Sequence, residues 1–292
     1  MDFEELRPHL LRVGYRITGS LADAEDAVQE AWLRWTEHAA EVRDPRAWLT
    51  TVVGRICLDR LTSAAARRET YVGPWLPEPL VTAPDDEGPL AAVVRGEDVR
   101  LAALLLLDRL TPAQRVALVL HDALGEAHAE IAAVLGCSEE AARQHAARAR
   151  RVIAAAGPLP PRAPAAAEEK VLAVFVDALA RADREALLEV LHPDVVLTSD
   201  GGGAVRTALR PVAGADKLIR LLTGLLRQYG AALDPAGWVP VRVNGEPGFA
   251  TPDLPGVPPS ATALTVVLDE AGEPRIAAAR QVMNPAKLRV WW

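Results

Sequence analysis

The sequence is poor in cysteine and in aromatic residues. Only two of its 292 residues are cysteines, Cys57 and Cys137, which are too few for a disulfide framework and favour a reducing compartment. Aromatic side chains make up 4% of the chain, although seven of them are tryptophans. No N-terminal stretch has the basic start and apolar run of a signal peptide, and no apolar run is long enough to span a membrane. The sequence therefore predicts a cytoplasmic protein with no membrane partner.

Positive charge is also scarce, because the formal net charge is −7. This balance argues against a general nucleic-acid binder. The distribution of charge is more informative than the sum. Residues 20–41 carry six acids and one arginine, whereas residues 43–68 carry six arginines and two aspartates. An acidic helix followed by a basic helix suggests two binding faces for two partners, although two solvated amphipathic helices would give the same pattern.

Residues 126–153, EAHAEIAAVLGCSEEAARQHAARARRVI, have the pattern of a helix, a tight turn and a second helix. Gly136 suits the end of the first helix because glycine adopts the left-handed conformation at little cost. Ser138 can cap the second helix, and its polar face is rich in arginine. This is the pattern of a helix-turn-helix, whose second helix enters the DNA major groove. An alanine-rich helical hairpin with a solvated basic face would give the same signal.

Helical spacing of apolar residues predicts three helices before this motif, at 2–18, 21–39 and 45–68, and two more within 97–124. Proline-rich linkers are predicted at 71–95 and 157–167. From residue 168 the pattern changes to two helices, a strand, another helix at about 214–229 and three further strands, which predicts an α+β unit with a curved, mostly antiparallel sheet.

The segments FEELRPHLLRVGYRITGSLADAEDAVQEAWLRW and DPRAWLTTVVGRICLDRL, followed by the helix-turn-helix, resemble a bacterial extracytoplasmic-function (ECF) sigma factor. The resemblance implies two all-α sigma domains and core RNA polymerase and promoter DNA as partners. The expected domains are 1–70 (region 2, core polymerase and −10 element), 96–156 (region 4, −35 element) and 168–292, joined by the linkers 71–95 and 157–167. The implied function is promoter-specific transcription initiation, with no catalytic residue, cofactor or metal.

Candidate contact residues follow by position from this resemblance. The acidic helix of the family docks on core polymerase, which implies as contacts Asp23, Glu25, Asp26 and Glu30. The basic helix recognises and helps to melt the −10 element, which implies Arg55, Arg60, Arg67 and Arg68. The recognition helix reads the −35 element, which implies Ser138, Arg143, Gln144, Arg148 and Arg150. The −10 helix is poor in aromatic residues, so capture of the melted strand is expected to rest on a pocket and on arginine.

The C-terminal pattern FVDALARADREALLEVLHPDVVLTSDGGG resembles the SnoaL-like, nuclear-transport-factor-2-like cone. WLPEP, DGGG and NPAKL resemble three motifs of the ECF subgroup that carries this domain, and imply a regulatory contact between the linker and the third domain. The residues implied are Trp75, Leu76, Pro77, Glu78, Pro79, Asp200, Gly201, Gly202, Gly203, Asn284, Pro285, Lys287 and Leu288. The usual motifs carry lysine and aspartate where this chain has Ala204 and Ala286, which puts any polar contact at those two positions in doubt.

Two alternatives remain open at this stage. A helix-turn-helix repressor would bind DNA without polymerase, but the acidic segment Asp23–Glu30 argues against it. A DNA-binding module fused to a ligand-sensing or enzymatic SnoaL-like domain would bind a small molecule in the C-terminal pocket. No acid–base pair stands out in the sequence of that domain, since His192 and Asp194 flank a proline at the predicted start of a strand.

Overall fold

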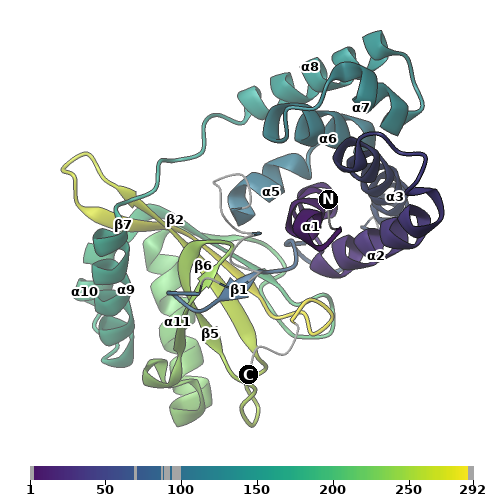
Figure 1. The fold of residues 1–292 in the computed structure, drawn as a ribbon. Helices are drawn as coiled ribbons and strands as arrows, with labels where there is room; N and C mark the ends of the chain where they lie inside the picture. The colour runs from purple at the N-terminus through teal and green to yellow at the C-terminus, as the bar shows by residue number, and fades with distance from the viewer. Residues whose placement is uncertain (1–2, 69–70, 87, 89–92, 94–99, 289–292) are drawn as a thin grey trace. The chain divides into compact units, whose positions relative to one another are not determined.

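The computed structural model describes residues 3–68, 71–86, 88, 93 and 100–288. Its backbone divides into two compact units (Figure 1). The N-terminal unit comprises residues 1–70 and 87–159, and the C-terminal unit comprises residues 71–86 and 160–292. Residues 71–86, which the sequence assigns to a linker, thus group with the C-terminal unit. No helix among the described residues is long and apolar enough to cross a membrane.

Three helices open the N-terminal unit: α1 (Phe3–Thr18), α2 (Leu21–His38) and α3 (Pro45–Arg68). The starts of α2 and α3 are fixed by local hydrogen bonds that the sequence predicts. Ser20 Oγ accepts the backbone N–H of Asp23 at 3.2 Å, and Asp44 Oδ1 accepts that of Ala47 at 3.1 Å. These side chains satisfy donors that the first turn of a helix leaves without a partner.

The second part of this unit consists of α5 (Leu101–Leu107), α6 (Pro112–Leu118), a π-helical turn (Val119–Ala123), α7 (His128–Leu135) and α8 (Glu139–Ala155). The helix-turn-helix is confirmed. Gly136 ends α7 in the left-handed conformation, with φ 63°, and Ser138 caps α8 by accepting the N–H of Ala141. Thr111 and Gln114 form a capping box at the start of α6.

The N-terminal unit has one continuous hydrophobic core. Leu10, Leu49 and Val53 from the first three helices pack in the same cluster as Val116 and Ile131 from the later ones. Helix α3 therefore lies against both α6 and α7. The close approach depends on Gly54, because a Cβ atom at this position would come within 3.2 Å of Val134.

In the C-terminal unit, α9 (Ala165–Ala180), α10 (Arg184–Val190) and α11 (Ala215–Tyr229) pack against one face of a seven-stranded sheet (Figure 1). The strand order is β1-β4-β5-β6-β7-β2-β3. All neighbouring strands are antiparallel except the parallel pair β2 and β7. The strands are β1 (Val81–Thr82), β2 (Leu191–Asp200), β3 (Val212–Ala213), β4 (Val239–Val243), β5 (Glu246–Thr251), β6 (Ser260–Leu268) and β7 (Pro274–Val282).

Four strands depart from the sequence-based expectation: β1, β2, β3 and β5. The two-residue strand β3 was not expected between the glycine turn and α11. Strand β5 was not expected, because Pro247 and Gly248 usually interrupt strands. Gly248 is required there, since a Cβ would lie 1.9 Å from the Thr262 carbonyl oxygen. Strand β1 lies in a segment expected to be irregular, and it forms by pairing with β4 rather than from its own sequence. Strand β2 begins at Leu191, so His192 and Asp194 lie within it and not before it.

Candidate functional site

The predicted polymerase-contact acids lie on α2. Two of them pair with the same arginine of α3: Arg60 Nη1 donates to Asp23 and to Asp26, each at 3.2 Å. Glu30 pairs with Arg34 at 2.5 Å, and Glu25 is half-buried. The acids are therefore gathered on one helix, while Asp23 and Asp26 neutralise a side chain that the sequence assigns to −10 DNA.

The predicted −10 arginines fall into two groups. Arg55 is exposed, and its guanidinium donates from Nε and Nη2 to the carbonyl oxygen of Ala133 in α7, at 3.0 and 2.6 Å. Arg60 is paired with Asp23 and Asp26 of α2. Arg67 and Arg68 lie in the last turn of α3, and their side chains fall outside the described part of the structure. Both described arginines are thus engaged within the N-terminal unit.

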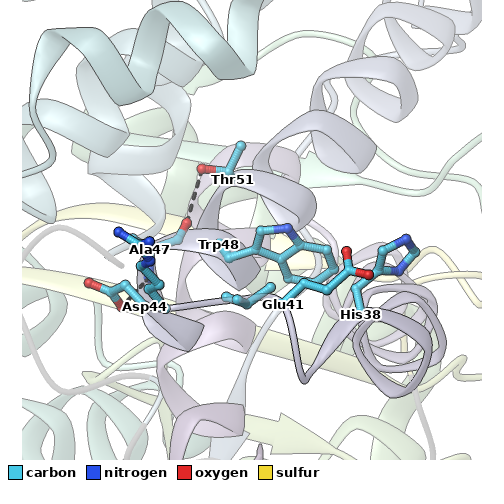
Figure 2. Close-up of a pocket in the computed structure, with 8 residues that line it drawn as sticks. His38, Glu41, Asp44, Ala47, Trp48 and Thr51 are labelled. Atoms are coloured by element: carbon cyan, nitrogen blue, oxygen red, sulfur yellow. Dashed lines mark hydrogen bonds between the residues drawn. The ribbon is translucent and has the colours of Figure 1, made fainter.

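A pocket of about 440 Å³ opens where α2 ends and α3 begins. Figure 2 shows the Trp48 indole in the middle of this group, between Asp44 and His38. The ring of Trp48 lies 6.1 Å from the His38 ring and 6.0 Å from the Trp35 ring, measured between centroids. Exposed Glu41, Arg43 and Asp44 add two negative charges and one positive charge. Aromatic rings therefore line the pocket at the start of α3.

The five predicted −35 residues are all exposed on or beside α8. Arg143 pairs with Glu139 and Glu140 at 2.9 and 2.8 Å, and Gln144 donates to Glu140 at 3.3 Å. Arg150 pairs with Asp122 and lies 3.0 Å from His121 Nδ1. The hydrogen bonds from Arg150 lower the pKa of Asp122. Arg148 and Ser138 complete the set.

Two arginines join the halves of the N-terminal unit. Besides Arg55, the guanidinium of Arg115 in α6 is almost fully buried and donates to the carbonyl oxygen of Arg16 in α1, at 3.4 and 3.3 Å. It also pairs with Asp108 at 3.2 Å. The carbonyl oxygens of Ala133 and Arg16 thus accept hydrogen bonds from a charged guanidinium. Such hydrogen bonds are stronger than those between neutral groups. The helix-turn-helix is thereby fastened to the first three helices.

The segment Trp75–Leu80 is embedded in the C-terminal unit. Its residues from Leu76 to Leu80 are buried. The centre of the contact is Asp200, a fully buried carboxylate. Asp200 accepts the backbone N–H of Leu76 at 2.8 Å and the hydroxyl of Tyr71 at 2.5 Å. A buried carboxylate needs such partners, because its charge would otherwise be costly to desolvate.

Lys287 supplies the charge that balances Asp200. Its ammonium donates to Asp200 at 2.6 Å and to the carbonyl oxygen of Leu76 at 2.5 Å, and it lies 4.3 Å from the centre of the Trp75 ring. Asn284 donates to the Tyr71 hydroxyl at 2.9 Å. Ala204 and Ala286 are exposed turn residues, and the polar contact with Asp200 comes from Lys287. The three motifs therefore meet around one carboxylate.

The glycines of this cluster have a steric role. Gly202 and Gly203 have φ of 59° and 75°, which favours glycine. A Cβ at Gly202 would lie 2.2 Å from the Asn284 amide. The turn of residues 284–288 is closed by the N–H groups of Lys287 and Leu288, which both donate to the Asn284 carbonyl oxygen. Gly201 and Pro285 lie in the same two turns.

Comparison with known proteins identifies the two helical parts. Residues 3–67 match the family described as Sigma-70 region 2, and residues 100–153 match Sigma-70, region 4. The chain is 49% identical to the ECF RNA polymerase sigma factor SigJ of Mycobacterium tuberculosis H37Rv, over 98% of this chain and 92% of the relative. The chain belongs to the ECF sigma factors. Sigma factors bind core RNA polymerase and promoter DNA and are not an enzyme family.

Other comparisons agree with this family. The sigma factor is 35% identical to the probable ECF RNA polymerase sigma factor SigI of M. tuberculosis, over 73% of this chain and 71% of the relative. The crystal structure of M. tuberculosis SigJ superposes with a TM-score of 0.81 and 46% identity, covering 98% of this chain and 96% of that one. The predicted fold class is confirmed: sigma regions 2 and 4 followed by a SnoaL-like unit of helices and sheet.

Sequence reasoning missed several residues of these sites. Tyr71 and Arg115 form key contacts, but nothing in their neighbourhoods distinguishes them from surface residues. The pocket at Trp48 was missed because tryptophan is more often buried. Trp35 and Trp48 do pack against the core, whereas Trp32 is 39% exposed beside Phe3. Of the acid–base candidates on β2, His192 is half-buried and Asp194 is exposed.

Proposed function

We propose that this sigma factor delivers core RNA polymerase to paired −35 and −10 elements and that its C-terminal unit controls this activity in cis. The acids of α2 contact the polymerase, the exposed polar face of α8 reads the −35 element, and α3 with the loop before it binds the −10 element. A factor that acts on RNA polymerase works in the cytoplasm, and we propose this location for the chain.

The pocket at the start of α3 supports the proposal that this helix binds the −10 element. A base released from the duplex needs an aromatic face to stack on and a basic track for its phosphate. Trp48 and His38 offer the rings, and Arg43 offers the charge. The volume of about 440 Å³ is ample for one base. We propose that one melted base of the −10 element enters this pocket.

The described arrangement of the N-terminal unit represents a closed state. Elements at −35 and −10 are separated by about 25 base pairs, or roughly 85 Å of duplex at 3.4 Å per pair. In the closed state α3 touches α7 directly through Arg55, so regions 2 and 4 cannot reach both elements at once. Arg55 and Arg60 are also engaged within the protein. Binding to a promoter therefore requires the two regions to separate.

The regulatory proposal rests on the hydrogen bonds that Asp200 accepts from Tyr71 and Leu76. Region 2 ends at Arg68 and α5 starts at Leu101, so 32 residues separate them. Fully extended, these would span at most about 110 Å. Residues 71–86 of this stretch belong to the C-terminal unit. The 14 residues from 87 to 100 could span at most about 50 Å. The anchored segment thus restricts how far region 4 can move from region 2.

Transcription in vitro tests this proposal. Core RNA polymerase would receive the full chain and promoters whose −35 to −10 spacing varies by single base pairs. The variant Asp200→Asn keeps the size of the side chain but removes the charge paired with Lys287. The matched control is Asp194→Asn, an exposed aspartate on the same strand. Wild type and control should initiate within a narrow range of spacings, and Asp200→Asn should broaden it.

The outcomes separate the two parts of the proposal. Initiation by all three proteins with identical spacing preference would contradict control in cis while leaving promoter delivery intact. Failure of the wild type to initiate at any promoter in a random library would contradict promoter delivery. Replacing Trp48 with Ala should abolish preference at one −10 position, whereas Trp32→Ala should not, because Trp32 does not line the pocket.

A further inference from the structure

The linker that follows region 4 is anchored to the C-terminal unit by contacts of its own. Arg162 donates from Nη2 to the carbonyl oxygen of Gly245, at 2.6 Å. The next residue, Ala163, is buried, and its N–H donates to the carbonyl oxygen of Val266 in β6, at 3.3 Å. The sequence predicts an irregular linker over these residues. The structure shows that its second half is fixed in place.

A buried carboxylate strengthens this anchor. Glu168, in the first turn of α9, is 2% exposed. Its Oε1 accepts hydrogen bonds from Nε and Nη2 of Arg162, both at 3.4 Å. Its Oε2 accepts one from Nη1 of Arg242 in β4, at 2.5 Å. A buried charge requires such partners, so Glu168 holds both guanidinium groups in place.

The turn between β4 and β5 contacts both linkers. It consists of Asn244 and Gly245, whose φ of 54° and 75° match a hairpin turn that favours the pair Asn–Gly. The N–H of Asn244 donates to the carbonyl oxygen of Leu80 at 2.8 Å, and its Oδ1 accepts the N–H of Leu80 at 3.0 Å. Leu80 belongs to the linker before region 4, whereas Arg162, bound to Gly245, belongs to the linker after it.

Arg242 forms a second connection between the two linkers. Its backbone pairs with that of Thr82 in β1, which is part of the first linker. Its guanidinium pairs with Glu168, which also holds Arg162 of the second linker. A movement of either linker therefore disturbs residues that contact the other one. Residues connected in this way tend to open together as one local unit.

We propose that Arg242, Asn244 and Gly245 form a clamp that fixes the linkers on both sides of region 4 to the C-terminal unit and releases them together. With the clamp closed, six residues, 156–161, separate α8 from Arg162 and span at most about 25 Å. With the clamp open, nine residues, 156–164, separate α8 from α9 and span at most about 35 Å.

The difference of about 10 Å corresponds to about three base pairs of duplex at 3.4 Å per pair. The clamp thus limits the promoter spacings that region 4 can reach. As a means of control it rests on the function proposed above, whereas the coupling of the two linkers does not.

Amide hydrogen exchange of the free full chain, resolved to single residues by NMR, tests the coupling without polymerase or DNA. Its result is therefore independent of any failure of control in cis. The N–H groups of Leu80 and Asn244 report on the first linker, and that of Ala163 reports on the second. Amides of the paired strands β2 and β7, away from the turn, serve as the internal reference.

Two variants disturb the clamp from opposite sides. Arg162→Ala removes the contacts of the second linker but leaves Glu168 paired with Arg242. Asn244→Gly keeps the left-handed turn but removes the oxygen that accepts the N–H of Leu80. In each variant all three reporter amides should exchange at least about tenfold faster than in the wild type, and the reference amides should not change.

The matched control is Arg181→Ala, which removes an exposed arginine paired only with Asp177 of its own helix among the ion pairs of the described residues. Its reporter amides should exchange as in the wild type. Faster exchange confined to Ala163 in Arg162→Ala, or to Leu80 and Asn244 in Asn244→Gly, would overturn the proposal, because the linkers would then open independently. Unchanged reporter amides, or equally faster exchange of the reference amides, would also overturn it.

Discussion

At the scale of single residues, three arginines of this sigma factor bind other parts of the same chain. Arg55, Arg60 and Arg115 bind a carbonyl oxygen, two carboxylates and a second carbonyl oxygen, respectively. Sequence position identified Arg55 and Arg60 as candidates for DNA. It could not identify their partners, because Ala133 lies 78 residues from Arg55 along the chain. In the sequence, Arg115 could not be told from a surface arginine of a helix, because its partner Arg16 lies 99 residues away along the chain.

A carboxyl pair at the start of α7 makes stability depend on pH. Burial and the neighbouring Glu130 raise the pKa of Glu126 to about 7, from an ordinary value of 4.5. Between these values the folded chain keeps a proton that the unfolded chain has released, so stability falls as pH rises through this window. Arg46 opposes the shift and Asp44 adds to it.

We predict that Glu126→Gln removes this contribution. Urea denaturation of wild type and variant at a series of pH values isolates it, because all other titrating groups are common to both proteins. Among these groups is His9, whose pKa burial lowers to about 4, with the opposite sign of pH dependence. The stability of the wild type relative to the variant should decrease from pH 5 to pH 7.5. If the stability of the wild type relative to the variant stays constant or rises over this pH range, Glu126 does not have the raised pKa assigned to it.

At the scale of elements, local signals predicted helices far better than strands. Ser20, Asp44, Thr111 and Ser138 each form the cap that their position indicates, because a cap involves residues only three apart. Strands β1 and β5 depend on partners distant in sequence. The SnoaL-like sheet was predicted in outline, but β5 could not be found in a segment that contains Pro247 and Gly248.

Helical glycines give an element-scale prediction with an internal control. A Cβ at Gly14 in α1 would lie 2.8 Å from Ala24 Cβ and 3.0 Å from its Cα, so α1 and α2 would have to move apart. Gly224 in α11 has open space at the same position. Gly14→Ala should therefore destabilise the N-terminal unit by about 1–3 kcal/mol.

The matched change Gly224→Ala should stabilise the C-terminal unit by about 0.5–1 kcal/mol, because alanine favours the helix. Thermal unfolding followed by circular dichroism measures both effects. A stabilising Gly14→Ala would mean that α1 and α2 are packed less closely than described.

At the scale of the whole molecule, the resemblance to a family supplied what residue patterns alone could not. The patterns predicted a helix-turn-helix and an α+β unit. Only the motifs shared with ECF sigma factors indicated that Trp75–Pro79, Asp200–Gly203 and Asn284–Leu288 belong to one site. The structure brings these three segments together around Asp200. That regions 2 and 4 share one core was not predicted, since it depends on matched apolar faces of α3, α6 and α7.

We propose that regions 2 and 4 are closed on each other in the free sigma factor and separate on the promoter. Spin labels on α3 and α8 measure this directly, through cysteines introduced at exposed Asp59 and Arg151. Cys137 would be replaced by serine. Cys57 can remain, because burial raises its pKa to about 12 and keeps it an unreactive thiol.

Double electron–electron resonance would compare the free protein with its complex with core polymerase and promoter DNA. We expect one narrow, short distance in the free protein and an increase of tens of ångströms in the complex, since the two elements lie roughly 85 Å apart along the duplex. An unchanged distance in a complex that is competent for initiation would mean that regions 2 and 4 do not separate on the promoter.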